Sequence, residues 1–82
     1  MERRIVWDEP KRLANLAKHG LDFSDLNAQF FRQAKVGPSR DGRLIAVGEL
    51  RGIVTVVFVE LGREALSVVS MRPASARERK RL

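Results

Sequence analysis

The chain has 82 residues, of which 44% are hydrophobic and 32% charged, a composition that predicts a globular protein and excludes a disordered one. Sixteen Lys and Arg against ten Asp and Glu give a net charge of +6, which favours nucleic acid, an acidic protein or a membrane surface as partner. The length predicts one domain, residues 1–82, and the absence of cysteine excludes disulfides and zinc–thiolate sites. Because the sequence shows neither a signal peptide nor a long apolar run, we expect the protein in the cytoplasm.

The chain is predicted to begin with a short strand at residues 4–7 and a helix directly after it. Asp8 is expected to cap the helix and Pro10 to occupy its first turn, where a missing N–H does no harm. The helix should run to about Lys18, because Gly20 suits the left-handed residue that ends a helix. One face of the helix carries apolar side chains at spacings of three and four, namely Leu13, Leu16 and Ala17.

A second helix is predicted from about Ser24, which would cap it, to Arg32. Because Phe30 and Phe31 are adjacent on this helix, we expect one of them to pack under the sheet and the other to point elsewhere, where it could meet a partner. Residues 35–43 are predicted to form a loop, since they contain glycine, proline and a turn pair.

Three strands are predicted next, at residues 44–49, 53–60 and 65–71, because these segments are rich in β-branched and apolar residues. Short connections that contain glycine indicate hairpins and therefore an antiparallel meander. The middle segment is almost entirely apolar, which indicates a central strand covered on both faces.

The last strand is predicted to alternate between two faces and to lead into a final helix. One face would carry Leu66, Val68 and Ser70, and the other Ser67, Val69 and Met71. Ser75 and Glu78 have the spacing of a capping box, which indicates that the helix begins there. We expect it to end at Leu82.

Cleavage of an RNA phosphodiester without a metal needs a base for the 2′-hydroxyl, cations around the phosphorus and a proton for the leaving 5′-oxygen. His19 is the only histidine and is expected on the last turn of the first helix, where the carbonyl ends favour cations. Arg72 stands between the last strand and the final helix, and its guanidinium matches phosphate. Ser75 and the N–H groups after it would add an anion-binding helix start. The remaining acid–base duty would fall to water or to one of Glu60, Glu49, Lys11 and Lys18.

Structural explanations compete with each of these roles. His19 would cap the helix end, Arg72 would pair with a carboxylate, Ser75 would cap the final helix, and residues 77–81 would form a solvated face. Trp7 is expected to pack at the entrance of the first helix. The sequence has no glycine-rich phosphate loop, no H-E-x-x-H and no His–carboxylate cluster at metal-ligand spacing, so we expect neither a metal nor a cofactor. A helix-turn-helix is disfavoured because half of the chain reads as strand.

Two patterns resemble those of the BrnT family of toxins. The first, W-D-x-x-K-x-x-x-N-x-x-K-H-G-x-x-F, covers residues 7–23, and the second, S-x-R-x-A-S-x-R-E-R, covers residues 70–79. The resemblance implies an α+β fold of the RelE-like kind, with a short N-terminal strand, two helices, a three-stranded antiparallel meander and a short C-terminal helix. It also implies a ribonuclease that arrests translation and is neutralised by a BrnA-type antitoxin with a ribbon-helix-helix part. Operator DNA would then be contacted only through the antitoxin complex, and no membrane would be involved.

The leading hypothesis is therefore an endoribonuclease toxin that acts without a metal. It requires that the end of the first helix and the start of the last one meet at a single groove. Replacing Arg72 by Ala should then abolish toxicity and leave the melting temperature nearly unchanged. The residues expected to be catalytic are Arg72, His19, Arg43 and Ser75, and those expected to bind RNA are Lys11, Lys18, Arg77 and Arg79. The alternative hypothesis is a non-catalytic basic module that acts in a DNA-binding toxin–antitoxin repressor complex.

Overall fold

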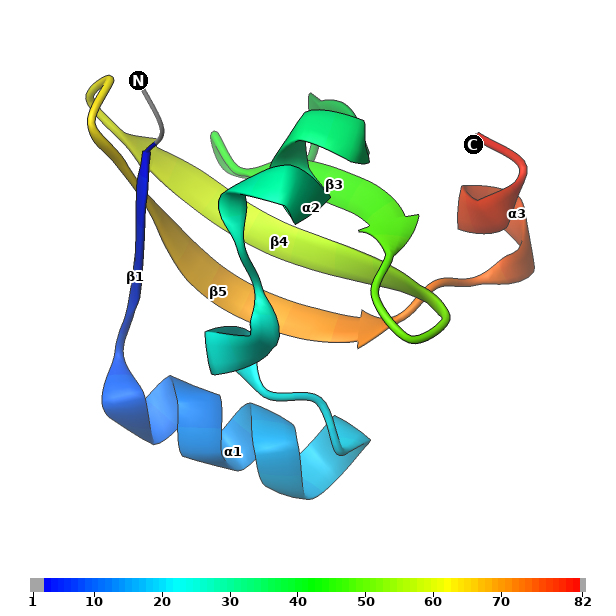
Figure 1. The fold of residues 1–82 in the computed structure, drawn as a ribbon, viewed down its shortest axis with the longest axis horizontal. Coiled ribbons are helices and arrows are strands. Elements are labelled where there is room, and N and C mark those ends of the chain that lie inside the picture. Colours follow the sequence, from blue (N-terminus) through cyan, green and yellow to red (C-terminus); the bar gives the residue numbers. More distant parts are fainter. Residues whose placement is uncertain (1–2, 82) are drawn as a thin grey trace.

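In the computed structural model, which describes residues 3–81, a twisted five-stranded sheet is flanked by helices (Figure 1). The elements in chain order are β1 (Arg4–Trp7), α1 (Glu9–His19), a 3₁₀ turn η1 (Phe23–Asp25), α2 (Ala28–Gln33), β2 (Lys35–Pro38), β3 (Leu44–Glu49), β4 (Ile53–Leu61), β5 (Ala65–Pro73) and α3 (Ala76–Arg79). The strand order is β1-β5-β4-β3-β2, in which β1 runs parallel to β5 and the other neighbours are antiparallel. The mixed α+β fold predicted from the sequence is confirmed.

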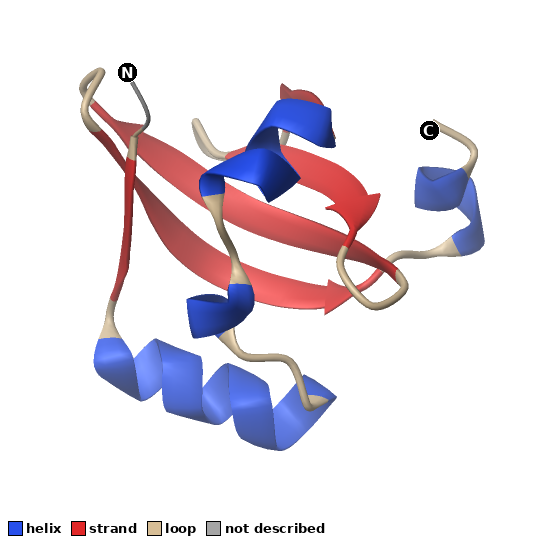
Figure 2. Ribbon diagram, viewed as in Figure 1, coloured by secondary structure: helices blue, strands red, loops and turns tan. Residues whose placement is uncertain are grey.

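The predicted meander forms the centre of the sheet, and β4 is its middle strand, as expected (Figure 2). Both faces of β4 are covered, since Val56 and Phe58 on one face and Thr55 on the other are almost inaccessible to solvent. The core on the first face is closed by η1 and α2, which contribute Phe23 and Phe30. Burying such large side chains in one cluster supplies most of the stability of so small a domain.

The prediction of a loop over residues 35–43 is wrong for its first four residues. Lys35–Pro38 pair with β3 as an antiparallel edge strand, in which Lys35 lies opposite Val47 and Pro38 opposite Leu44. Proline is tolerated at an edge strand because one side of such a strand makes no ladder hydrogen bonds. The glycine and proline therefore mark an edge, not a loop.

The predicted helix over residues 24–32 is divided into η1 and α2, and Ser24 does not cap it. The N–H and hydroxyl of Ser24 both donate to Asp22 Oδ1, at 2.9 and 2.8 Å. Asn27 has extended backbone angles and accepts the Phe30 N–H on its side chain at 2.9 Å, so it is Asn27 that begins α2. By accepting the Phe30 N–H, the Asn27 side chain favours a new helix start at this position over a continuous helix from residue 24.

Phe30 and Phe31 both pack into the core, and the prediction that one points elsewhere is wrong. The Phe31 ring lies edge-on against Phe30 at 5.2 Å and against Phe58 at 5.3 Å. Close approach of α2 to the sheet makes this possible, because a Cβ at Gly48 would lie 3.1 Å from the Phe30 ring. Glycine at this position lets Phe30 sit directly on β3, and Phe31 then packs against Phe30 and Phe58.

The predicted alternation along the last strand is wrong beyond Val68. Val57 lies opposite Ser70 and Phe58 opposite Val68, so Val69 is an extra residue, a β-bulge. The bulge reverses the phase of the strand, and Met71 takes the buried position that the simple alternation assigns to Ser70.

The two helix ends that the sequence marks most clearly are confirmed. Gly20 ends α1 in the left-handed conformation at φ 69°, and its N–H donates to the Leu16 carbonyl at 2.8 Å. Ser75 and Glu78 form the expected capping box at the start of α3. The helix ends at Arg79, and Leu82 lies outside the described residues. Among residues 3–81 there is no helix with the length and apolarity needed to cross a membrane.

Candidate functional site

The edge of β5 is shared between β1 and α1. β1 pairs with β5 only as far as Val68, and α1 lies along the remainder of the strand (Figure 1). The buried Asn15 joins the two elements, because its Oδ1 accepts the Met71 N–H and its Nδ2 donates to the Leu21 carbonyl, each at 3.1 Å. Its two hydrogen bonds hold α1 at a fixed position against the bulged part of β5.

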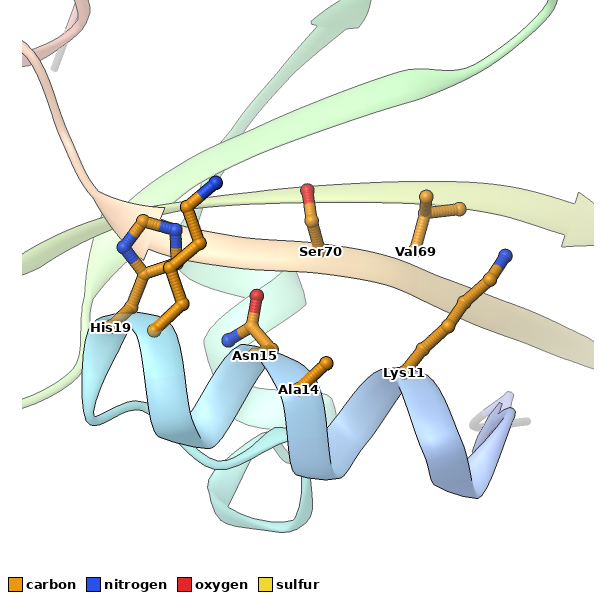
Figure 3. Close-up of a pocket in the computed structure, with 7 residues that line it drawn as sticks. Lys11, Ala14, Asn15, His19, Val69 and Ser70 are labelled. Carbon is orange, nitrogen blue, oxygen red and sulfur yellow. The ribbon is translucent and has the colours of Figure 1, made fainter.

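An open groove of about 300 Å³ lies between α1 and the bulge in β5 (Figure 3). Its lining is Lys11, Ala14, Asn15, Lys18, His19, Val69 and Ser70. The side chains of Lys11 and His19 extend from α1 toward β5, where the Ser70 hydroxyl stands (Figure 3). The groove therefore places two ammonium groups, an imidazole and a hydroxyl around one space that solvent can enter. Such a concentration of positive charge attracts a polyanion.

Arg72 lies two residues beyond Ser70 on β5 and is engaged with α3. Its Nη1 and Nη2 each donate to a carboxylate oxygen of Glu78 at 2.7 Å, which is a bidentate ion pair. Glu78 also accepts from Thr55 Oγ1 and from the Ser75 N–H, both at 2.9 Å. This cluster, which we call the Glu78 clamp, ties α3 to β4 and β5.

The Glu78 clamp strongly favours the charged forms of its members. The hydrogen bonds from Arg72, together with those from Ser75 and Thr55, lower the pKa of Glu78 to about 2 against the opposing effect of burial. The same pairing raises the pKa of Arg72. Arg72 is therefore held as a cation whose guanidinium fork is directed at a carboxylate, and it is not among the residues that line the groove.

The other predicted site residues lie outside the lining of the groove. The Ser75 Oγ accepts the Glu78 N–H at 3.2 Å, so it serves the helix cap. Arg77 and Arg79 are exposed on α3. Arg43 is exposed just before β3, a strand separated from β5 by β4, and its N–H donates to the Arg40 carbonyl at 3.0 Å.

The structure adds Asn15 and Ser70 to the candidate residues. From the sequence, Asn15 is only a letter of a pattern, and Ser70 is assigned to a face of the last strand without a role in the site. A signal for Asn15 was available, because an amide side chain between apolar residues of a helix must find partners if it is buried. The sequence assigns Ser70 to the face of Leu66 and Val68, and this is wrong because the bulge at Val69 moves Ser70 to the other face. Within residues 3–81, no group of three or more His, Cys, Asp or Glu side chains is arranged to hold a metal ion.

A second ionic cluster fixes the N-terminal part of α1. Arg12 donates to Glu9 at 2.7 Å and to Asp22 at 3.0 Å, and the Trp7 indole N–H donates to Glu9 at 3.0 Å. Trp7 also lies edge-on to Phe23 at 6.4 Å, so it packs at the entrance of α1 as the sequence predicts. The hydrogen bonds from Ser24 and from Arg12 lower the pKa of Asp22. The cluster connects α1 to η1 and so to the core.

The fold and the groove define a small α+β domain with a cationic surface suited to a polyanionic substrate. The family described as "Ribonuclease toxin, BrnT, of type II toxin-antitoxin system" matches residues 7–78. The crystal structure of the Brucella abortus ribonuclease toxin BrnT is similar with a TM-score of 0.84 and 56% identity, over 89% of this chain and 97% of that one. No curated protein matches the chain significantly. The chain belongs to the BrnT family of ribonuclease toxins, and the type II system implies an antitoxin partner.

Proposed function

We propose that this chain is an endoribonuclease that cleaves RNA without a metal in the groove between α1 and β5, and that it thereby inhibits translation in the cytoplasm. The observation that carries the proposal is the convergence of Lys11, Lys18 and His19 from α1 on Ser70 of β5. Membership of the family favours a ribonuclease over the alternative of a non-catalytic binding module.

Each groove residue has a role that its chemistry supports. Lys11 and Lys18 would bind the phosphates on either side of the scissile bond. In the reaction, the 2′-oxygen attacks the phosphorus, the bond to the 5′-oxygen breaks, and the products are a 2′,3′-cyclic phosphate and a 5′-hydroxyl. His19 performs one of the two proton transfers, and a lysine of the groove or water performs the other. Ser70 donates a hydrogen bond to a phosphate oxygen.

Arg72 contributes positive charge to the negative phosphorane from beside the groove. Glu78 accepts from both terminal nitrogens and the Pro73 carbonyl accepts from Nη1 at 3.5 Å, which leaves the Nε–H and one N–H of Nη2 for a phosphate. Arg77 and Arg79 would extend the RNA-binding surface over α3, and Arg43 would add charge from the segment just before β3. Because Ser75 is occupied as a helix cap, its contribution is to hold α3 in place.

The experiment that tests this proposal is incubation of the purified protein with RNA in excess chelator. We expect cleavage that yields 2′,3′-cyclic phosphate ends, and we expect His19→Ala to reduce the rate roughly a hundredfold, which is ordinary for the loss of general acid–base catalysis. Intact RNA in chelator, with cleavage restored by magnesium or zinc, would contradict metal independence. Intact RNA under both conditions would contradict the proposed activity of the free toxin.

The proposed partner is a BrnA-type antitoxin with a ribbon-helix-helix part, and operator DNA is bound only through the complex with it. A basic toxin with net charge +6 is suited to an acidic inhibitor that covers its cationic groove. Binding of operator DNA by the toxin alone, with the affinity of the complex, would contradict this division of roles.

A further inference from the structure

The amphipathic character of α1 is reversed with respect to the sheet. A helix on the surface of a domain normally turns its apolar side inward. In α1, the side chains that are buried or half-buried are Arg12, Asn15 and His19. The apolar side chains are all exposed to solvent, and they are Pro10, Leu13, Ala14, Leu16 and Ala17. We call this second set the α1 strip.

The polar contacts on the inner side fix the rotation of α1 about its axis. Asn15 bonds to the backbone of β5, and Arg12 forms an ion pair with Asp22 at 3.0 Å. Turning the α1 strip toward the sheet would break both contacts and leave buried polar groups without partners, at a cost of about 1 to 3 kcal/mol for each group. The exposure of the α1 strip is therefore a property of the fold.

A contiguous apolar strip that is kept in contact with water marks an interaction surface. Leu13 retains 52% of its accessible surface and Leu16 retains 36%. Lys11 and Lys18, both exposed, border the strip on the side of the groove, and Ala14 belongs to the strip and to the groove lining together. The surface thus combines an apolar ridge with a cationic margin that leads directly into the proposed RNA site.

We propose that the α1 strip is the docking site of the antitoxin, and that an amphipathic antitoxin helix with an apolar ridge and an acidic flank occupies it. The charge of the margin selects this occupant, because an acidic flank pairs with Lys11 and Lys18, whereas a second copy of this chain would bring its own lysines against them. Since both lysines line the groove, the bound helix neutralises the residues that would hold RNA. This inference rests on the proposed antitoxin partner and adds the surface where it binds.

The test is a titration of the full-length toxin with its purified cognate antitoxin, with a Leu13→Glu, Ala17→Glu double variant. Both positions are exposed and glutamate is a good helix former, so α1 should persist. We expect the Kd to rise about a hundredfold because the new carboxylates repel the acidic flank, while RNA cleavage by the free variant stays at the wild-type rate. Leu61→Glu is the matched control, because Leu61 is 49% exposed on β4, and its Kd should not change.

A single Leu13→Ser variant, expected to weaken binding about tenfold, keeps the test decisive if the double variant does not fold. Unchanged antitoxin affinity in folded Leu13→Ser overturns the proposal. Self-association of the wild-type toxin through the α1 strip, together with unchanged antitoxin binding by the substituted toxin, also overturns it. If the wild-type toxin fails to cleave RNA and the substitution still weakens antitoxin binding, the proposed function is overturned and the docking site is supported.

Discussion

At the scale of single residues, Arg72 combines a structural and a proposed chemical role. The leading hypothesis from the sequence gives Arg72 a role at the phosphate, so that its removal leaves the melting temperature nearly unchanged, and the competing explanation pairs it with a carboxylate. The structure changes this expectation, because Arg72→Ala would leave the Glu78 carboxylate, with a side chain only 14% exposed, without its principal partner. The position of Arg72 near the end of the last strand could be predicted from the sequence. The identity of its carboxylate partner could not, because Glu78 is also the capping-box residue that the local pattern already explains.

We predict that Arg72→Ala lowers the cleavage rate by a factor of about 10² to 10³ and the free energy of unfolding by about 1 to 3 kcal/mol. The comparison variant is Glu78→Gln, which disrupts the same ion pair and keeps the arginine. If Arg72 acts on phosphate, Glu78→Gln retains most of the activity at a temperature where both variants are folded. Equal losses of activity in the two variants would assign Arg72 a purely structural role. Arg63→Ala, in the exposed turn before β5, controls for the loss of a cation.

The Glu78 clamp also predicts a dependence of stability on pH. Because folding lowers the pKa of Glu78 from 4.5 to about 2, its contribution is complete above pH 4.5 and is lost as the pH falls toward 2. We expect the difference in unfolding free energy between the wild type and Glu78→Gln to shrink by about 1 to 3 kcal/mol over this range. Urea titrations of both proteins from pH 6 to pH 2 measure it. Glu9 and Asp22 also have lowered pKa values, but both proteins share them, so their contribution cancels in the difference.

At the scale of elements, the features that the sequence predicts are those that local chemistry decides. Gly20 ends α1 and Ser75 begins α3, because the required conformation or hydrogen bond lies within a few residues. β2 and the bulge at Val69 depend instead on pairing with a neighbouring strand of the sheet, which local composition cannot reveal. The orientation of α1 is of the second kind, since Asn15 faces inward to bond with Met71.

We predict that Asn15→Ala reduces the free energy of unfolding by about 2 to 4 kcal/mol. The substitution removes the hydrogen-bond partner of both the Met71 N–H and the Leu21 carbonyl. The specific readout is hydrogen exchange, in which the Met71 amide should lose more protection than its neighbours in β5. Asn27→Ala removes an amide side chain from a helix cap elsewhere, and it should cost about 1 kcal/mol without affecting Met71. Unaltered protection of the Met71 amide in Asn15→Ala would show that Asn15 does not hold α1 against β5.

At the scale of the whole molecule, the sheet separates two kinds of surface. η1 and α2 close the apolar core on one face, whereas α1 lies at the β5 edge and bears both the groove and the α1 strip (Figure 1). The sign of the net charge indicates a polyanion from the sequence alone. The location of the binding surface needed the structure, because basic residues are distributed along the chain, and among those within residues 3–81 it is Lys11, Lys18 and His19 that line the groove.

This distribution predicts that the salt dependence of RNA binding is sensitive to position. With a 2′-O-methyl RNA oligonucleotide, which lacks the attacking hydroxyl, Lys18→Ala should weaken binding and reduce the slope of log K against log salt by about 0.7, the value for one phosphate contact on a single strand. Lys35→Ala removes the same charge from β2, at the opposite edge of the sheet from β1 and β5. It should leave the slope nearly unchanged, because the removed charge lies far from the bound phosphates. Equal reductions in the two variants would mean that RNA responds to the net charge of the molecule and that the groove is not its binding site.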